Sequence, residues 1–314
     1  MAVVALTTYT QAIGEADVEK LRGILDRDGF EFLSKPYAHF SARKGKLNVT
    51  VYKKGPKVLV QGKETEDFVK FTFEPEILGE ARLGYEEVHN PEMFAPHFGI
   101  DESGKGDYFG PLVIAGVYTD AVTTRALIEA GVMDSKRVSS SARIRALAAS
   151  IRKTHGIREA VVLIGPERYN ELYEKFTNLN ELLAWGHAKV IEELSVRVPA
   201  CPRALSDQFA NPRVLQRALA RKGLEIELQQ RTKGESDVAV AAASILAREA
   251  FVSWMEQAAA EWGLPLALGA GPPVLEAGRA FLAMHGEQEL RKVGKFHFKT
   301  TNQLTSEGSE GGIP

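Results

Sequence analysis

The pattern of apolar and polar residues changes along the chain. In the amino-terminal part, apolar residues recur at helical spacing between positions 18 and 25, and they alternate with polar residues between 47 and 52, as in a half-buried strand. A Lys-Lys-Gly-Pro turn at 53–56 leads into a further strand at 57–61, and a short apolar run at 3–6 predicts another. We therefore expect a small unit built from strands, a helix and a hairpin.

The rest of the chain alternates helical and strand patterns. From residue 121 onward, stretches with helical spacing alternate with short apolar runs at 160–164, 204–206 and 224–228. The long stretch from Val238 to Trp262 is apolar on most sides in its first half, so we expect a helix buried against a sheet. This alternation is typical of an α/β layer fold.

A charged, glycine-rich run joins two further apolar strands, predicted at 98–100 and 112–118. It reads G-I-D-E-S-G-K-G-D-Y-F-G-P from Gly99. Asp101 and Glu102 only accept hydrogen bonds when ionised, and they repel each other unless a cation lies between them, which favours Mg²⁺ or Mn²⁺. Because neighbouring side chains on a strand point to opposite faces, we expect the strand to end near Ser103 so that both carboxylates serve one site.

Two other interpretations of this run compete with a metal site. The motif of a phosphate-binding loop, G-x-x-x-x-G-K, fits residues 99–105. That loop needs Ser or Thr at the next position, where this chain has Gly106, and two carboxylates of this chain would face the phosphates. An ordinary charged turn stays open from this segment alone, because Asp, Gly and Lys are common turn residues.

Two more carboxylates follow elements of predicted structure. Asp207 lies in a short strand pattern at 203–209, and Asp237 directly precedes the long helix. Taken singly, Asp207 is an ordinary strand-end residue, and Asp237 is a charge that the helix dipole favours at a helix start. Together with Asp101 and Glu102 they make four candidate metal ligands.

Several motifs, taken together, resemble bacterial ribonuclease HIII. They are D-E-S-G-K-G-D-Y-F-G-P-L from Asp101, D-S-K at 134–136, N-L-N at 178–180 with L-L-A-W-G-H-A-K from Leu182, D-Q-F-A at 207–210, and S-D-V-A-V-A-A-A-S-I-L-A-R from Ser236. Their order and approximate spacing agree with that family over about residues 94–300. The resemblance implies an RNase H-like fold, with a central mixed sheet flanked by helices. It also implies an Asp-Glu-Asp-Asp site whose catalytic and metal-binding residues are Asp101, Glu102, Asp207 and Asp237.

The implied reaction is hydrolysis of the RNA strand of RNA/DNA hybrids by two divalent ions, leaving 5′-phosphate and 3′-hydroxyl ends. In such chemistry one ion activates a water and the other stabilises the leaving oxygen, so no side-chain nucleophile is needed. In this family the G-K-G element recognises ribose, which implies that Ser103, Gly104, Lys105 and Gly106 bind substrate. Weaker candidates for phosphate or supporting contacts are Lys136, Asn178, Asn180, Lys189 and Ser244, each of which is as readily explained as a solvated or capping residue.

The amino-terminal region of that family resembles a repeat of the TATA-binding protein, and V-T-V-Y-K-K-G-P-K-V-L-V-Q-G from Val49 matches its hairpin. The implied organisation is a TBP-like substrate-binding domain at 1–90, an RNase H-like catalytic domain at 91–300 and a disordered tail at 301–314. The acidic stretch 86–96, which contains proline, is the predicted linker. Basic residues and tyrosines on such a sheet would contact a duplex backbone.

Composition fits two globular domains, since the chain has 314 residues, of which 44% are hydrophobic. The net charge of −2 averages over regions that act separately. Basic residues cluster at Arg43, Lys44, Lys46, Lys53, Lys54, Lys57 and Lys63, and again at Arg291, Lys292, Lys295, His297 and Lys299. Taken by itself, such a cluster is usually a solvated face.

A single cysteine, Cys201, excludes a disulfide framework within the chain and a multi-cysteine zinc site. We find no apolar run that approaches the length of a membrane span and no signal-peptide pattern at the start. We therefore expect a cytoplasmic, monomeric protein whose partner is an RNA/DNA hybrid duplex and which has no membrane contact.

Two rival functions remain. A non-catalytic nucleic-acid-binding protein would keep the basic clusters but has no need of four converging carboxylates. The related type II enzyme shares the chemistry but cuts at a single ribonucleotide embedded in DNA. Type II enzymes carry a tyrosine in a G-Y-G setting that packs on the sugar at the RNA-to-DNA junction, and the corresponding stretch here is Gly269-Ala270-Gly271.

This difference leads to a first prediction. Alanine cannot supply the aromatic surface of tyrosine, which in nucleic-acid contacts is worth on the order of 1–3 kcal/mol. We expect efficient cleavage of hybrids with several consecutive ribonucleotides and little cleavage at one ribonucleotide in duplex DNA, measured as initial rates on labelled substrates of equal length. Comparable rates on both substrates would contradict the type III assignment while leaving the metal chemistry untouched.

Overall fold

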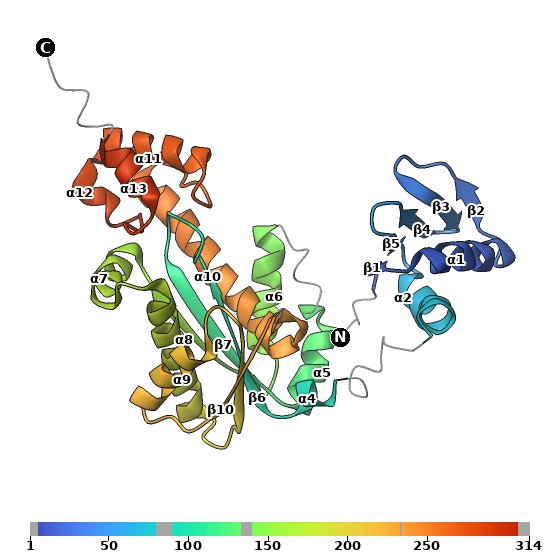
Figure 1. Ribbon diagram of the computed structural model, residues 1–314, viewed down its shortest axis with the longest axis horizontal. Helices are drawn as coiled ribbons and strands as arrows, with labels where there is room; N and C mark the ends of the chain where they lie inside the picture. The colour runs from blue at the N-terminus through green and yellow to red at the C-terminus, as the bar shows by residue number, and fades with distance from the viewer. Residues whose placement is uncertain (1–5, 80–89, 133–139, 233, 307–314) are drawn as a thin grey trace, which may run out of the picture. The chain divides into compact units, whose positions relative to one another are not determined.

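The structure is a computed structural model that describes residues 6–79, 90–132, 140–232 and 234–306. The chain divides into two compact units, Met1–Glu92 and Met93–Pro314 (Figure 1). Each unit has a sheet and a hydrophobic core of its own.

The amino-terminal unit contains a five-stranded antiparallel sheet in the order β1-β5-β4-β3-β2. Its strands are β1 (Thr8–Ala12), β2 (Glu31–Leu33), β3 (Ala38–Lys44), β4 (Leu47–Tyr52) and β5 (Lys57–Gln61). Its helices are α1 (Glu15–Arg27), α2 (Thr65–Phe68) and the π-helix η1 (Val69–Leu78). The strand expected at 3–6 falls mostly outside the described residues, and the first described strand is β1.

Alternation along the strands gives this sheet two unlike faces. Valines of β4 and β5 point to one face and pack against the apolar side of α1, the side that the helical spacing at 18–25 predicted. Positions between them pair across the other face, where Arg43 lies opposite Asn48 and Tyr52 lies opposite Lys57. One face of the sheet is therefore core, and the other carries polar and basic side chains.

The second unit is built on a mixed five-stranded sheet in the order β10-β9-β6-β7-β8. The strands are β6 (His97–Ser103), β7 (Leu112–Thr119), β8 (Arg158–Ile164), β9 (Arg203–Asp207) and β10 (Glu227–Arg231). β6, β7 and β8 pair antiparallel, whereas β9 is parallel to both β6 and β10. The predicted class, a central mixed sheet flanked by helices, is confirmed.

Helices cover both faces of this sheet (Figure 1). The described helices of this unit are α4 (Pro91–Phe94), α5 (Ala121–Glu129), α6 (Ser141–Lys153), α7 (Pro166–Phe176), α8 (Leu179–Arg197), α9 (Pro212–Arg221), the 3₁₀ helix η3 (Gly234–Ser236), α10 (Val238–Trp262), α11 (Pro272–His285), α12 (Glu287–Leu290) and α13 (Lys299–Ser306). On β7, Val113 and Ala115 pack in a core with α5, α6 and α10, whereas Leu112 and Ile114 pack in a second core with α8 and α9.

α10 runs along β6 in close contact. A Cβ built on Gly99 would collide with the backbone of Ala239 and Val240, and one built on Gly104 would meet the ring of Phe251. By length and hydropathy α10 could cross a membrane, contrary to the expectation that no run approaches that length, but 61% of its most apolar window is buried inside the unit. It is the core helix that its apolar first half predicted.

The carboxyl end departs from the predicted tail at 301–314. Helix α13 continues to Ser306, because Thr301 and Leu304 are buried and Leu304 packs against Gly278 of α11. Local composition gives little sign of this helix, since its apolar contacts lie with a distant part of the chain. Residues 307–314 of the predicted tail lie outside the described residues.

Candidate active site

Acidic residues lie at the carboxyl ends of two neighbouring strands, β6 and β9. The parallel ladder between these strands ends at the pair Ile100 and Ser206. Asp101 and Asp207 are the next residues on each strand and therefore lie at the same edge, and Glu102 follows Asp101. The structure thus brings three of the four predicted carboxylates to one place.

β6 ends at Ser103, as we expected, and it stays paired with β7 up to that residue. Asp101 and Glu102 consequently point to opposite faces of the strand. Asp101 is hydrogen-bonded to Ser244 of α10, whereas Glu102 Oε2 lies 3.1 Å from His187 Nε2 of α8. The two carboxylates flank the strand instead of sharing one face.

This spread has a consequence for metal binding. Among the residues that the structure describes, no group of three or more His, Cys, Asp or Glu side chains is arranged to hold a metal ion. Mg²⁺ is commonly held by one or two carboxylates while it keeps several waters and binds substrate phosphates. The oxygen ligands at this edge fit that open kind of site.

The two neighbouring carboxylates have different electrostatic environments. Burial and the charge of Glu102 raise the pKa of Asp101 to about 6. Burial also opposes ionisation of Glu102, but the hydrogen bond with His187 and the charge of Lys105 outweigh it and lower the pKa of Glu102. The protein therefore stabilises the negative charge of Glu102 with its own groups and leaves that of Asp101 unfavourable, which fits Asp101 as a ligand for a cation.

Two basic residues hold Glu102 in place. His187 is fully buried on α8, with its ring centre 4.7 Å from that of Phe209. Lys105 Nζ lies 3.5 Å from Glu102 Oε1 and 5.8 Å from the centre of the Phe209 ring. The sequence contained His187 within its L-L-A-W-G-H-A-K motif, but a histidine on an apolar helical stretch gives no sign of a partner on a distant strand.

The turn after β6 requires glycine at one position and is open at another. Gly104 has φ +83°, and a Cβ there would collide with the carbonyl oxygen of Pro111. A Cβ on Gly106 would meet nothing within 4 Å, so the backbone there is accessible. This geometry agrees with the expectation that other groups approach the backbone at Gly106.

Asp237 is not brought to the other three carboxylates. Its Oδ1 accepts hydrogen bonds from the amides of Ala239 at 2.8 Å and Val240 at 3.3 Å, and it lies 3.0 Å from His97 Nε2. His97 begins β6, four residues and roughly 13 Å from Asp101 at the usual rise of a strand. In this structure the carboxylate of Asp237 thus caps α10 and contacts a buried histidine at the opposite end of β6 from Asp101.

The 3₁₀ helix η3 approaches the site more closely than Asp237 does. The amide of Gly234 donates to Asp207 Oδ1 at 2.9 Å. Glu235 is the next residue of η3. An acidic position thus lies in the backbone segment that contacts Asp207.

The remaining predicted residues fall into different settings. Asn178 caps α8 through its side chain, which accepts from the amide of Asn180 at 2.8 Å. Asn180 is exposed and lies two turns before His187 on the same side of α8. Lys189 instead pairs with Glu192 at 3.0 Å. Lys136 and its D-S-K motif lie outside the described residues.

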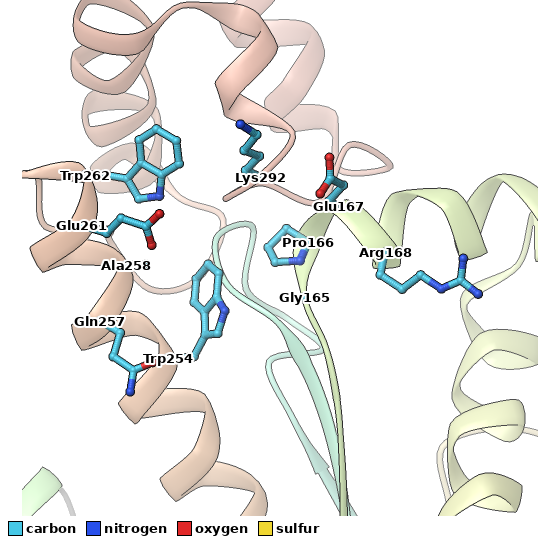
Figure 2. Close-up of a pocket in the computed structure, with 10 residues that line it drawn as sticks. All are labelled: Gly165, Pro166, Glu167, Arg168, Trp254, Gln257, Ala258, Glu261, Trp262 and Lys292. Atoms are coloured by element: carbon cyan, nitrogen blue, oxygen red, sulfur yellow. The ribbon is translucent and has the colours of Figure 1, made fainter.

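A cavity of about 340 Å³ lies elsewhere in this unit (Figure 2). It is lined by Gly165, Pro166, Glu167, Arg168, Trp254, Gln257, Ala258, Glu261, Trp262 and Lys292. Figure 2 shows the two tryptophans projecting from α10. None of these residues belongs to the acidic edge, which is formed by Asp101, Glu102 and Asp207, or to the glycine turn, which runs from Ser103 to Gly106. The cavity is therefore separate from the candidate active site.

Comparison with protein families identifies the class. The family model for Ribonuclease HII matches residues 98–301, and a domain of unknown function, DUF3378, matches residues 15–77. The mixed sheet with acidic residues at the ends of β6 and β9 is thus that of a ribonuclease of the RNase H type.

Relatives of known name cover nearly the whole chain. Ribonuclease HIII of Protochlamydia amoebophila is 45% identical over 91% of this chain and 93% of its own length, and that of Chlamydia caviae is 42% identical over 92% and 94%. Among solved structures, Bst-RNase HIII in complex with Mn²⁺ matches with a TM-score of 0.67 at 28% identity and covers 97% of this chain and 100% of that one. Aquifex aeolicus RNase H3 matches with a TM-score of 0.54 at 25% identity, over 93% and 100%. The chain therefore belongs to the ribonuclease HIII family, which confirms the resemblance and makes it an enzyme.

The contrast between Asp101 and Asp237 leads to a second prediction. Asp101→Asn removes a buried charge whose pKa is raised, so without divalent ions at pH 7.5 it should increase the free energy of unfolding by about 1–3 kcal/mol. Asp237→Ala removes a helix cap and the partner of His97, so it should decrease that free energy by about 2–4 kcal/mol.

Tryptophan fluorescence during urea denaturation measures both effects, because Trp185, Trp254 and Trp262 all lie in the second unit. The gain at Asp101 should fade as the pH falls from above 6 to below 4, because the folded protein then binds the proton that the unfolded chain binds only at lower pH. A loss of stability in Asp101→Asn, or none in Asp237→Ala, would reverse the two roles.

Proposed function

We propose that this ribonuclease HIII hydrolyses the RNA strand of RNA/DNA hybrids as a metal-dependent endonuclease, leaving 5′-phosphate and 3′-hydroxyl ends. The observation that carries the proposal is the buried Asp101 carboxylate beside Asp207, at the point where β6 and β9 cease to pair. Carboxylate oxygens are the ligands that Mg²⁺ and Mn²⁺ prefer. The Mn²⁺ complex of the Bst enzyme supports divalent ions as its cofactors.

The residues have distinct roles in this proposal. Asp101 and Asp207 would hold the two ions, and Glu102, oriented by His187, would add a ligand from the other face of β6. When bound, such ions activate water and stabilise the leaving ribose oxygen. Lys105 already neutralises part of the charge on Glu102, and its partly exposed ammonium can also attract the phosphate backbone.

We propose Glu235 in place of Asp237 as the fourth carboxylate. Oδ1 of Asp237 already accepts from two helix amides and lies against His97. Glu235 directly follows Gly234, whose amide binds Asp207. The two acidic residues lie two positions apart in the motif, so sequence order alone does not distinguish them.

Recognition of RNA is assigned to the glycine turn. The accessible backbone at Gly106 allows close approach of a sugar edge, and the 2′-hydroxyl is the group that distinguishes RNA from DNA. Ser103, Gly104 and Lys105 complete the turn. Asn180 and Ser244 are proposed as supporting residues, since Asn180 shares a face of α8 with His187 and Ser244 binds Asp101.

The amino-terminal unit is proposed to bind the duplex through the sheet face opposite α1. That face carries Arg43, Asn48, Tyr52 and Lys57, which can reach phosphate oxygens without reading sequence. The basic cluster predicted between Arg43 and Lys63 supports this choice of face, because β3, β4, β5 and their turns supply it.

A third prediction tests the catalytic assignment. Asp101→Asn, Glu102→Gln, Asp207→Asn and Glu235→Gln should each reduce hybrid cleavage by on the order of 100-fold or more, the scale of removing one well-placed electrostatic interaction with the transition state. Asp237→Asn is the matched control, because asparagine is also a good helix cap and this carboxylate lies away from the site. Single-turnover cleavage of a labelled hybrid measures the rates, and EDTA should abolish wild-type activity.

Near wild-type rates in Asp101→Asn and Asp207→Asn would contradict the metal site. A severe loss in Asp237→Asn, with Glu235→Gln active and both folded, would restore the assignment made from sequence. Hybrid binding, followed by fluorescence anisotropy in Ca²⁺, should remain in all variants, because the duplex contacts lie elsewhere.

A fourth prediction concerns the amino-terminal sheet. If Arg43 and Lys57 bind phosphates, Arg43→Gln with Lys57→Gln should weaken hybrid binding and reduce the slope of log K against log salt by about 2, one unit for each phosphate that is no longer neutralised. Lys20→Gln with Arg22→Gln, on exposed positions of α1, removes the same charge from the opposite face. Equal slopes for the two double variants would contradict the choice of face.

A further inference from the structure

A buried lysine near the carboxyl end binds the segment that directly follows the glycine turn. Lys295 follows α12, and its side chain is fully buried. Its Nζ donates to the carbonyl oxygens of Asp107 at 2.7 Å and Gly110 at 2.7 Å, and it lies 3.5 Å from that of Phe109. One ammonium therefore binds the carbonyls of a single short segment, residues 107–110.

This burial is costly: Nζ is hydrogen-bonded to backbone carbonyls, and the charge of Asp107 offsets only part of the effect of burial. Burial lowers the pKa of Lys295 to about 7. An ammonium has three donors and no acceptor, and here it makes two short hydrogen bonds to backbone oxygens and a third, long one. The ring of Tyr169, with its centre 5.7 Å away, is a further favourable neighbour for the cation.

Backbone contacts reinforce the same connection. The amide of Lys295 donates to the carbonyl of Tyr108 at 2.9 Å, and the amide of Gly110 donates to that of Val293 at 2.9 Å. The amide of Gly269 donates to Asp107 Oδ1 at 2.6 Å. Segments that are distant in sequence thus hold residues 107–110 on several sides.

Residues 107–110 directly follow the glycine turn and fix the position of its carboxyl end. β6 fixes the turn up to Ser103, and residues 107–110 fix it from the other end. Within the turn, the backbone hydrogen bond from the amide of Asp107 to the carbonyl of Gly104 measures 3.4 Å, which is long. The position of Lys105 and Gly106 therefore depends on how firmly residues 107–110 are held.

We propose that Lys295 is a positioning residue for substrate recognition, whose ammonium fixes the carbonyls of residues 107–110 and so holds Lys105 and Gly106 in place for the RNA strand. This inference rests on the proposed role of the turn in binding RNA. It assigns to the carboxyl-terminal segment a part in substrate affinity, although that segment lies away from the acidic edge. Charge and hydrogen bonding are required, because an apolar side chain of the same length would leave the carbonyls without a donor.

The test compares Lys295→Met with the wild type in the full chain. Methionine keeps the length and removes the donors, so KM for hybrid should rise about tenfold while kcat changes less than about threefold. Amide hydrogen exchange, measured without substrate, should become at least tenfold faster in residues 104–111 and stay unchanged in β8 and α8. Lys295→Gln, which keeps an amide donor, should give a smaller change in KM and in the exchange rate. It replaces Lys295→Met in the test if the methionine variant does not fold.

Leu215→Ala in α9 is the control, because it opens a cavity in the other hydrophobic core of this unit, which contains none of residues 104–111. It should lower stability with KM and the exchange of residues 104–111 unchanged. An unchanged KM in both Lys295 variants, or faster exchange spread over the whole second unit, would overturn the proposal. If the wild type does not cleave hybrid, the proposed function fails, whereas the exchange result still reports separately on the support of the turn by Lys295.

Discussion

The catalytic unit depends on burying negative charge at the end of β6. Two adjacent carboxylates lie there between helices α8 and α10, and each would lose stability by ionising in an apolar setting. The protein stabilises one of them itself, since His187 and Lys105 hold Glu102. The other, Asp101, is bonded to the Ser244 hydroxyl and to backbone, and burial together with the charge of Glu102 keeps its pKa raised. Because the negative charge of Glu102 is compensated within the protein and that of Asp101 is not, the edge suits a bound cation better than a closed ion-pair network.

Chain topology determines what surrounds this charge. β9 is parallel to β6 and stops pairing at Ser206, so Asp207 arrives at the same edge as Asp101. The close packing of Gly99 on α10 places Ser244 beside Asp101 further along the helix. Lys295 then fixes the segment after the glycine turn through its carbonyls. The site therefore combines contributions from distant parts of the second unit.

Local patterns predicted what local physics determines. Strand alternation, the long apolar helix and the turn residues gave most elements, and strand-end carboxylates gave Asp101, Glu102 and Asp207. At Asp237 the sequence leaves two roles open, because a cap and a metal ligand have the same residue type at a helix start, and its contacts with His97 and two amides favour the cap. His187 and Lys295 were not predicted as contacts of the site because their partners are 85 and at least 185 residues away in sequence.

We propose that the acidic edge of β6 and β9 binds divalent ions. Electron paramagnetic resonance of Mn²⁺, titrated into the full chain with an uncleavable hybrid present, measures that binding directly. We expect two bound ions per chain in the wild type and in Asp237→Asn, and loss of both in the Asp101→Asn, Asp207→Asn double variant at unchanged hybrid affinity. Equal Mn²⁺ binding by the wild type and the double variant would contradict the proposal.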